Sequence, residues 1–151
     1  MQERMKNPLF VLPEALKALQ AAEAATHSEG LPLTTCKLVM LRASQINGCS
    51  FCVDMHSKEL RHAGVADQKI FAVAAWRETR GFTPAERAAL ALAEAATRLA
   101  DRPEAITEEI WADAARWFDE KALAGLVLQI GLINLFNRVN AAIRMPVGEA
   151  A

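Results

Sequence analysis

Residues 41–64 of the chain read LRASQINGCSFCVDMHSKELRHAG. Gly48 is placed to end one helix, because glycine readily adopts the left-handed conformation that often follows a helix C-terminus. Cys49 then begins a second helix, which Gly64 ends in the same way. The stretch therefore predicts two consecutive helices joined by a tight turn, and the same organisation extends to the rest of the chain.

Helix signals continue on both sides of this stretch. Thr83, Pro84 and Glu86 are the clearest start signal, since threonine can cap, proline fits the first helical position and glutamate completes a capping box. Asp119 is placed to cap a long last helix. The expected helices span approximately residues 13–26, 33–47, 49–64, 67–79, 84–99, 107–117 and 120–144. With about seven helices, short connections and no convincing strand, the sequence predicts an all-α fold in a single compact helical domain, residues 1–151.

The composition is that of a folded domain. Hydrophobic residues make up 52% and charged residues 23% of the chain, which argues against intrinsic disorder. The formal net charge is -1, so we expect no nucleic-acid partner. Alanine and leucine are abundant and tyrosine is absent, which favours helices over strands.

The cellular location is predicted from two segments of the chain. The N-terminal MQERMKNPLF has no apolar segment followed by a small-residue cleavage site, so we expect no secretory signal and a cytoplasmic protein. The most apolar segment, residues 122–136, is too short to span a bilayer, and we interpret it as a buried core helix without a membrane role. In the reducing cytosol, a close cysteine pair favours redox chemistry or a metal over a structural disulfide.

The last helix also bears on assembly. Residues 126–136 place apolar side chains nearly all round it, and a helix that is apolar on every face is normally buried on every face. In a domain of this size, one way to bury it is against a second subunit, which predicts a homo-oligomer. A central helix inside a monomer explains the same pattern equally well.

The chemistry-bearing motif is Cys49-x-x-Cys52 with His56 four residues further on. On a helix these three residues share one face. Because Gly48 ends the preceding helix, both cysteines fall in the first turn of the next one, where unpaired N–H groups and the helix dipole favour thiolate. A free cysteine has a pKa of about 8.5, and such surroundings lower it. Two cysteines at this spacing can cycle between dithiol and disulfide, and His56 can carry a proton.

Other interpretations of the motif are open to different degrees. Covalent haem attachment requires histidine directly after the second cysteine, where this chain has Val53. A zinc site would need a fourth ligand, which Cys36 could supply, but no second CxxC or HxxxH is present. A thioredoxin domain would place the CxxC after a strand in an α/β pattern, which this chain lacks. An inert buried pair also remains open, while we predict neither a metal nor a cofactor.

The remaining reactive or aromatic residues carry weaker signals. We expect Cys36 to fill the core, His27 and His62 to face solvent, and Asp54 to be a surface charge away from the motif. The three tryptophans, which we interpret as packing residues rather than as a cofactor site, are Trp76, Trp111 and Trp117.

Four segments of the chain resemble one known family. They are SQINGCSFCVDMHSKELRHAG, AAWRET, FTPAERAALALAEAATRLAD and LINLFNRVNAAIR. Together they are similar to the alkylhydroperoxidase D-like branch of the carboxymuconolactone decarboxylase superfamily. The resemblance covers residues 31–148 and is strongest over residues 38–97. The combination of CxxCxxxH with INGC and AWRET is what makes it specific.

The resemblance implies an all-α fold whose subunits assemble into trimers or hexamers. It implies peroxidase activity on a hydroperoxide, supported by a dithiol reductant such as a lipoyl protein. In the family, the second cysteine of the motif is taken as the peroxidatic thiol and the first as its resolving partner. Carried over, these roles make Cys52 the nucleophile, Cys49 the resolving cysteine and His56 the proton relay.

One residue departs from the family pattern. The best-known members have a glutamate twelve residues before the first cysteine, and this chain has Lys37 there. A lysine cannot accept and pass a proton as a carboxylate does near neutral pH. It would instead stabilise a thiolate as a nearby cation, provided that its side chain faces the site.

The sequence leaves three hypotheses for function. The first is a thiol peroxidase acting in antioxidant defence through a Cys49–Cys52 disulfide cycle. The second is a disulfide reductase or redox relay without significant peroxidase activity, and the third is a non-enzymatic oligomeric sensor or metal-binding protein. Decarboxylation is disfavoured, because that chemistry has no need of a CxxC pair.

Overall fold

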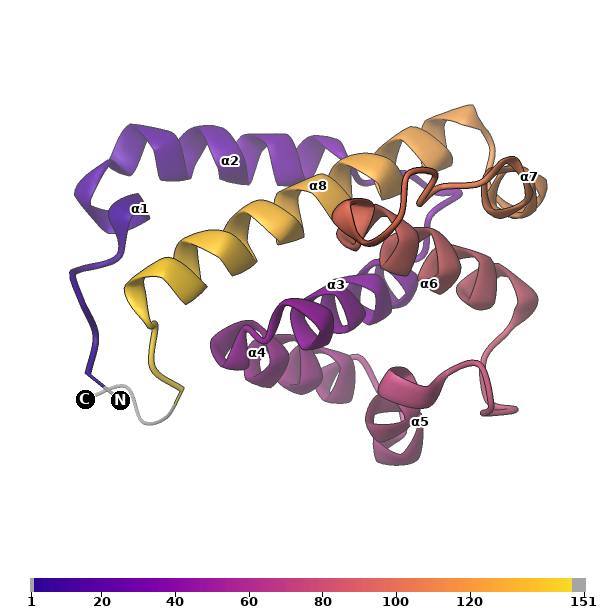
Figure 1. The fold of residues 1–151 in the computed structure, drawn as a ribbon, viewed down its shortest axis with the longest axis horizontal. Coiled ribbons are helices and arrows are strands. Elements are labelled where there is room, and N and C mark those ends of the chain that lie inside the picture. Colours follow the sequence, from indigo (N-terminus) through magenta and orange to yellow (C-terminus); the bar gives the residue numbers. More distant parts are fainter. Residues whose placement is uncertain (1, 148–151) are drawn as a thin grey trace.

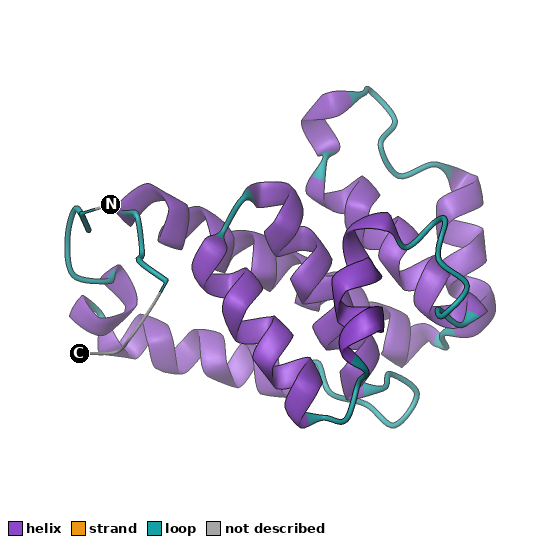
Figure 2. Cartoon of the chain, turned by 90° about the horizontal axis from the view of Figure 1, so that it is seen from below, coloured by secondary structure: helices purple, strands orange, loops and turns teal. Residues whose placement is uncertain are grey.

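The computed structural model describes residues 2–147 of the chain. Within them lie eight α-helices, α1 (Pro8–Val11), α2 (Pro13–Ala25), α3 (Leu33–Asn47), α4 (Ser50–His62), α5 (Asp67–Ala72), α6 (Pro84–Thr97), α7 (Glu108–Trp117) and α8 (Glu120–Ile143), and two 3₁₀ helices, Val73–Ala75 and Leu99–Asp101. The described part of the chain contains no β-strand, as Figure 2 shows. The expected all-α single domain is therefore confirmed, with one helix more than the sequence predicted.

Helix α3 is the centre of the fold. It packs against α4, α6 and α8, and the longest helix, α8, passes alongside α2 at the edge of the molecule (Figure 1). One buried cluster joins α3, α6 and α8 through residues such as Val39, Leu92 and Leu126. A smaller cluster joins α3, α4 and α8 and includes both cysteines of the motif, together with Met40 and Ile133. The motif is thus built into the core.

Local capping explains why most helix ends fall where the sequence predicts. Gly48 closes α3 in the left-handed conformation at φ 68°, and Cys49 follows at once as the N-cap of α4. Thr83 and Glu86 form the expected capping box at the start of α6. The Asp119 side chain accepts a hydrogen bond of 2.8 Å from Ala122 N, which starts α8. These ends depend only on neighbouring residues, so the sequence is sufficient to find them.

Two segments differ from the predicted helices. The four-residue α1 was not expected, and it forms because Asn7 caps it and Pro8 occupies its first position. The expected helix over residues 67–79 is only partly formed: α5 ends at Ala72 and a 3₁₀ turn follows. The helix stops because Trp76 Nε1 turns inward to donate to Glu94 of α6 at 3.0 Å, a contact that local propensity does not encode.

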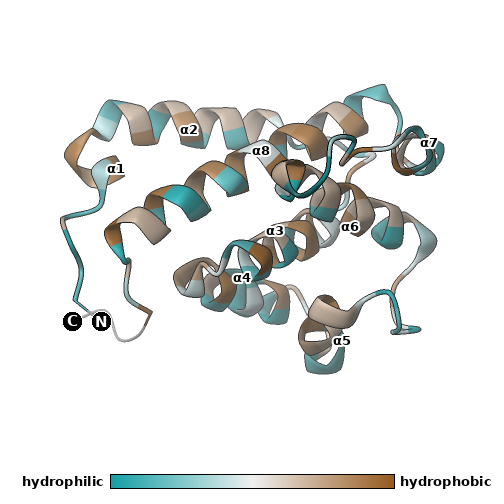
Figure 3. Ribbon diagram, viewed as in Figure 1, coloured by the Kyte–Doolittle hydropathy of each residue, from teal (hydrophilic) through white to brown (hydrophobic). Residues whose placement is uncertain are grey.

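Helix α8 is apolar on most of its surface but only partly covered. Leu126, Ile130 and Ile133 are buried, whereas Leu128 is 58% exposed and Val127 is 42% exposed. Apolar residues, in brown in Figure 3, run along it. The chain therefore buries one face of α8 and leaves an apolar stripe uncovered, and the homo-oligomer stays a prediction.

The length of α8 corrects one expectation. The segment judged too short to cross a bilayer belongs to a helix of 24 residues, because the helical pattern continues through Arg138 and Asn140. By length and composition alone, α8 could span a membrane, and it is the one such helix found among the described residues. Half of its most apolar window is buried within the protein, and core helices of soluble proteins pass the same test.

Candidate active site

The two cysteines of the motif lie at the start of α4. Cys49 is the N-cap residue, and its sulfur accepts a hydrogen bond of 3.3 Å from Cys52 N. The two residues form a disulfide, with their Cα atoms 5.4 Å apart. Both side chains are almost completely buried. The turn after Gly48 therefore places both sulfurs where they can bond to each other and where a helix N-terminus stabilises negative charge.

His56 lies one turn beyond Cys52 and is also buried. Its Nδ1 atom is 2.7 Å from Glu59 Oε2, while its Nε2 atom is buried without a hydrogen-bond partner in the described chain. A carboxylate can only accept, so Nδ1 carries a proton and donates it to Glu59. In the neutral imidazole, Nε2 then has a free lone pair that can accept a proton.

Glu59 also lies at the site, although it is not part of the predicted motif. Its carboxylate lies between His56 and Lys37, whose Nζ atom is 3.1 Å from the same oxygen that His56 binds. The hydrogen bond from His56 and, against the opposing effect of burial, the ion pair with Lys37 lower the pKa of Glu59 to about 2. Glu59 is therefore ionised near neutral pH and presents a negative charge to the imidazole.

Lys37 faces the site, which answers a question left by the sequence. Position 37, where the best-known family members have glutamate, supplies a cation here, and the carboxylate next to His56 comes from Glu59 on α4. The spacing between His56 and Glu59 places them on the same helix face, and this signal could have identified the pair. The contact between α3 and α4 that brings in Lys37 has no local signal.

A cavity of about 270 Å³ opens onto these groups. Cys52, His56, Lys37 and Glu59 line it, whereas Cys49 does not. Its other walls are largely apolar and include residues of α1, α2, α3, α4 and α8, among them Leu9, Phe10, Leu16, Met40, Phe51 and Phe136. An apolar pocket with a few convergent polar groups is the usual form of a small-molecule site. A molecule in this cavity would meet Cys52 before Cys49.

The cysteine pair also contacts a residue from a distant helix. Asn140, near the end of α8, donates a hydrogen bond of 3.3 Å from Nδ2 to Cys52 Sγ. No sequence signal connects the two residues, because 88 positions separate them.

The other candidate residues stay outside the site. Cys36 is buried in the core as expected, and burial raises the pKa of its thiol to about 11, so it is a poor nucleophile. Among residues 2–147, no group of three or more His, Cys, Asp or Glu side chains is arranged to hold a metal ion. Cys36 therefore does not complete a zinc site with the motif. His27 and His62 are exposed, as expected.

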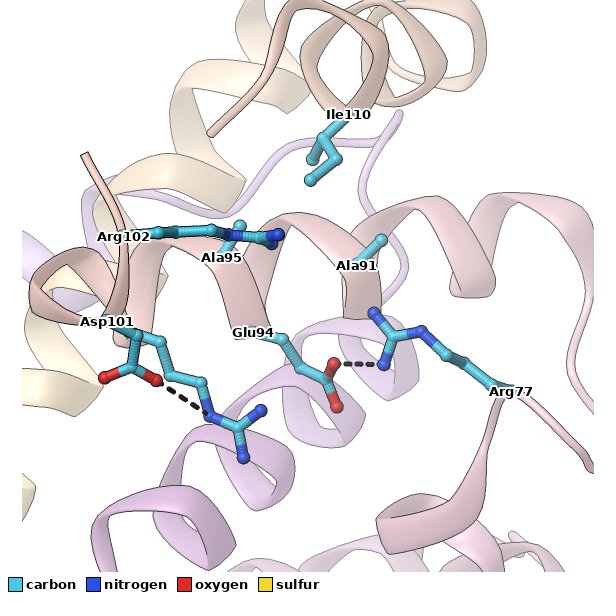
Figure 4. Close-up of a pocket in the computed structure, with 8 residues that line it drawn as sticks. Arg77, Ala91, Glu94, Ala95, Asp101, Arg102 and Ile110 are labelled. Atoms are coloured by element: carbon cyan, nitrogen blue, oxygen red, sulfur yellow. Dashed lines mark hydrogen bonds and ion pairs between the residues drawn. The ribbon is translucent and has the colours of Figure 1, made fainter. Parts of the chain in front are cut away.

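A second cavity, of about 370 Å³, lies beside α6 and contains no nucleophile (Figure 4). At its centre Glu94 accepts hydrogen bonds from Arg77, from Trp76 Nε1 at 3.0 Å and from Arg42 Nε at 2.5 Å. Burial acts to raise the pKa of Glu94, but these three donors together lower it. The cluster holds the segment after α5 against α6. Trp76 is thus a packing residue as expected, whereas Trp111 and Trp117 are nearly half exposed.

Comparison with known proteins places this site in a family. Residues 13–95 match the sequence profile of the carboxymuconolactone decarboxylase family. The chain belongs to the carboxymuconolactone decarboxylase family. A family member of Bacillus subtilis, the uncharacterised protein YdfG, is 35% identical over 132 residues, which are 87% of this chain and 88% of YdfG.

Two further comparisons concern proteins whose names refer to AhpD. The crystal structure of ATU0492 from Agrobacterium tumefaciens superposes with a TM-score of 0.87 at 37% identity, covering 97% of this chain and 100% of that one. ATU0492 is described as a protein of unknown function with a suggested role in antioxidant defence as an AhpD. The alkyl hydroperoxide reductase AhpD of Methylocella silvestris is 46% identical over 43 residues, which are 28% of this chain and 24% of that protein.

Proposed function

We propose that the protein is a thiol-dependent peroxidase that reduces hydroperoxides through a Cys49–Cys52 dithiol/disulfide cycle. The observation that carries the proposal is the position of Cys52, which lines an apolar cavity next to His56 while it is bonded to Cys49 on the other side. A substrate in the cavity would reach one sulfur, and the second sulfur is placed to resolve the product. The similarity to a suggested antioxidant defence protein and to an alkyl hydroperoxide reductase supports a peroxidase.

In the first step, the Cys52 thiolate attacks the terminal oxygen of a hydroperoxide. A sulfur–oxygen bond forms and the O–O bond breaks, so that Cys52 becomes a sulfenic acid and the peroxide is reduced by two electrons. The leaving alkoxide takes a proton and departs as an alcohol. In the second step, the Cys49 sulfur attacks the sulfenic sulfur, the disulfide forms, and the hydroxyl group leaves as water with the Cys49 proton.

His56 provides the proton in the first step. Its Nε2 atom takes the proton of the Cys52 thiol and returns it to the alkoxide, so that the cavity needs no other acid. Glu59 acts as a positioning residue: it holds the Nδ1–H tautomer, keeps Nε2 available and stabilises the imidazolium that forms. Lys37 fixes the Glu59 carboxylate in place.

An external dithiol then returns the disulfide to two thiols and is itself oxidised to a disulfide. A lipoyl group, as the family resemblance implies, is small and apolar enough for the cavity. The apolar lining also favours an organic hydroperoxide over hydrogen peroxide, because alkyl groups gain from leaving water. We further propose that subunits assemble through the uncovered stripe of α8 into a trimer or hexamer.

Coupled turnover tests the proposal. We expect dihydrolipoamide to support consumption of cumene hydroperoxide by the wild-type protein, and we expect Cys52→Ser to abolish it. A disulfide that cycles with dihydrolipoamide while no peroxide is consumed would instead select the second function, a disulfide reductase or redox relay. The cation at position 37, where the best-known members of the family have glutamate, is the observation that favours this alternative.

A further inference from the structure

Helix α8 carries three buried asparagines on one face, and one of them differs from the other two. Asn134 and Asn137 bind Asn47 at the end of α3 at 3.0 and 2.9 Å, and Asn137 also donates to Ser44, so both hold α8 against α3. Asn140 makes no contact of this kind. Its amide lies between Cys52 and Asn7.

The orientation of the Asn140 amide is fixed by a chain of three hydrogen bonds. The backbone N–H of Leu9, which can only donate, binds Asn7 Oδ1 at 2.9 Å. Asn7 must therefore present its NH₂ group to Asn140, and its Nδ2 atom lies 3.3 Å from Asn140 Oδ1. Asn140 in turn must direct its own NH₂ group to Cys52 Sγ, 3.3 Å away. The direction of each bond follows from the one before it.

The surroundings make this last bond strong when the sulfur is charged. Asn7, Asn140 and Cys52 are all buried, with no more than 8% of any of them exposed. A thiolate buried there loses most of its hydration, and a hydrogen bond to a charged acceptor is about twice as strong as one to a neutral acceptor. The amide has no proton to lose, so it acts as a donor over the whole working pH range.

We propose that Asn140 is a catalytic residue, whose side-chain amide stabilises the Cys52 sulfur as a thiolate, and that Asn7 is the positioning residue that orients this amide. The inference rests on the proposed function for the role of Cys52 as the attacking sulfur. The same donor acts again during reduction. A dithiol that enters the cavity attacks Cys52 and releases Cys49, and the second thiol of the reductant then displaces Cys52 from the mixed disulfide as a thiolate.

Each sulfur then has its own donor. Cys49 Sγ accepts from Cys52 N at the helix N-terminus, and Cys52 Sγ accepts from Asn140. The first donor belongs to the backbone and comes with the CxxC turn itself. The second comes from a helix far away in sequence, and it depends on the short N-terminal segment that carries Asn7.

The test measures thiol reactivity without any peroxide. In a Cys49→Ser background, alkylation of Cys52 by iodoacetamide is followed as a function of pH and located by mass spectrometry. Asn140→Leu, which removes the donor at similar volume, is expected to slow alkylation about tenfold near pH 7 and to move the pH profile upward by about one pH unit. Asn140→Asp, which places a carboxylate next to the thiolate, is expected to move the pH profile of alkylation further upward.

Asn7→Asp provides an independent variant that leaves Asn140 intact. The carboxylate introduced at position 7 would still accept from Leu9 N but could not donate to Asn140 Oδ1, so the Asn140 amide would turn its NH₂ group away from the sulfur. We expect the pH profile of Cys52 alkylation to move upward, as for Asn140→Leu. Unfolding by urea shows which variants fold, and the folded ones are compared.

Unchanged alkylation profiles in the folded variants would overturn the inference and leave Asn140 as an anchor for the N-terminal segment. The outcome is separate from that of the proposed function. If the wild-type protein consumes no peroxide, the alkylation profiles still report whether Asn140 stabilises the thiolate.

Discussion

The Nδ1 atom of His56 lies 2.7 Å from Oε2 of Glu59, one turn further along α4. Glu59 thereby gives the imidazole a carboxylate partner from its own helix, while the position on α3 that holds the carboxylate in the best-known relatives is Lys37. In this chain α3 therefore supplies a cation and α4 supplies the carboxylate that pairs with the histidine.

Replacing Glu59 by glutamine should slow peroxide turnover. The amide keeps the shape of the side chain but no longer stabilises an imidazolium, so we expect kcat to fall about tenfold or more while KM for the peroxide changes little. Asp54→Asn is the matched control, because Asp54 lies on the same helix and pairs with Lys58 at 2.8 Å, away from the cavity. If Glu59→Gln and Asp54→Asn lower kcat equally, Glu59 has no specific role in the mechanism.

A charge exchange between Lys37 and Glu59 tests their pairing. Lys37→Glu alone would place a second carboxylate near Glu59, and we expect it to lower both turnover and stability because like charges repel. The double variant Lys37→Glu/Glu59→Lys restores an ion pair and returns the carboxylate to α3. We expect it to recover a substantial part of the lost activity, with a coupling free energy of about 1 kcal/mol in a double-mutant cycle. Strictly additive effects would contradict the pairing.

Stability in acid should report the ionisation of Glu59. The pKa of Glu59 is lowered from 4.5 to about 2 in the folded protein. The stabilising contribution of its carboxylate is therefore complete above the unfolded value and is lost as the pH falls from 4.5 towards 2. Urea unfolding should show that the difference in stability between the wild type and Glu59→Gln shrinks over this range, and a constant difference would contradict the low pKa.

The cluster around Glu94 is expected to stabilise the fold without serving the chemistry. Its side chain is 6% exposed and binds Arg42, Arg77 and Trp76. Glu94→Gln leaves two guanidinium groups without their anion, so the free energy of unfolding should fall by about 3 kcal/mol. The rate of alkylation at Cys52 in the folded variant should stay at the wild-type value. A stable variant with an altered alkylation rate would show that the cluster serves the site instead.

The uncovered face of α8 should mediate assembly. The exposed large apolar residues of α8 are Leu128 at 58%, Val127 at 42% and Leu135 at 38%. A charge there cannot be buried against a second subunit without a large desolvation cost, so Leu128→Glu should convert the expected trimer or hexamer to monomers in light scattering. Phe71→Glu, at an apolar residue of α5 that is 71% exposed, is the control. A monomeric wild-type protein would contradict the prediction directly.

The sequence was sufficient where structure depends on neighbouring residues. Gly48, Thr83 and Asp119 end or begin helices through their own conformation and hydrogen bonds, so the expected ends agree with the observed ones. The helix after Asp67 was predicted too long because its end depends on Glu94, which lies outside any local window.

The same distinction applies to the site. Cys49, Cys52 and His56 could be grouped from their spacing, and Glu59 could have been added by the same argument. Lys37 and Asn140 could not, because their contacts to α4 arise from the packing of α3 and α8. The sequence therefore predicts the site residues that lie on the same helix as the motif, and it does not predict those that reach the site through helix packing.

The most direct test of the account is a single turnover of the reduced protein. We expect one equivalent of cumene hydroperoxide to lower the number of free thiols from three to one within seconds, with Cys36 as the remaining thiol. A peptide map should then show a Cys49–Cys52 link. If all three thiols persist in the presence of the hydroperoxide, the protein is not a thiol peroxidase, and the central claim is wrong.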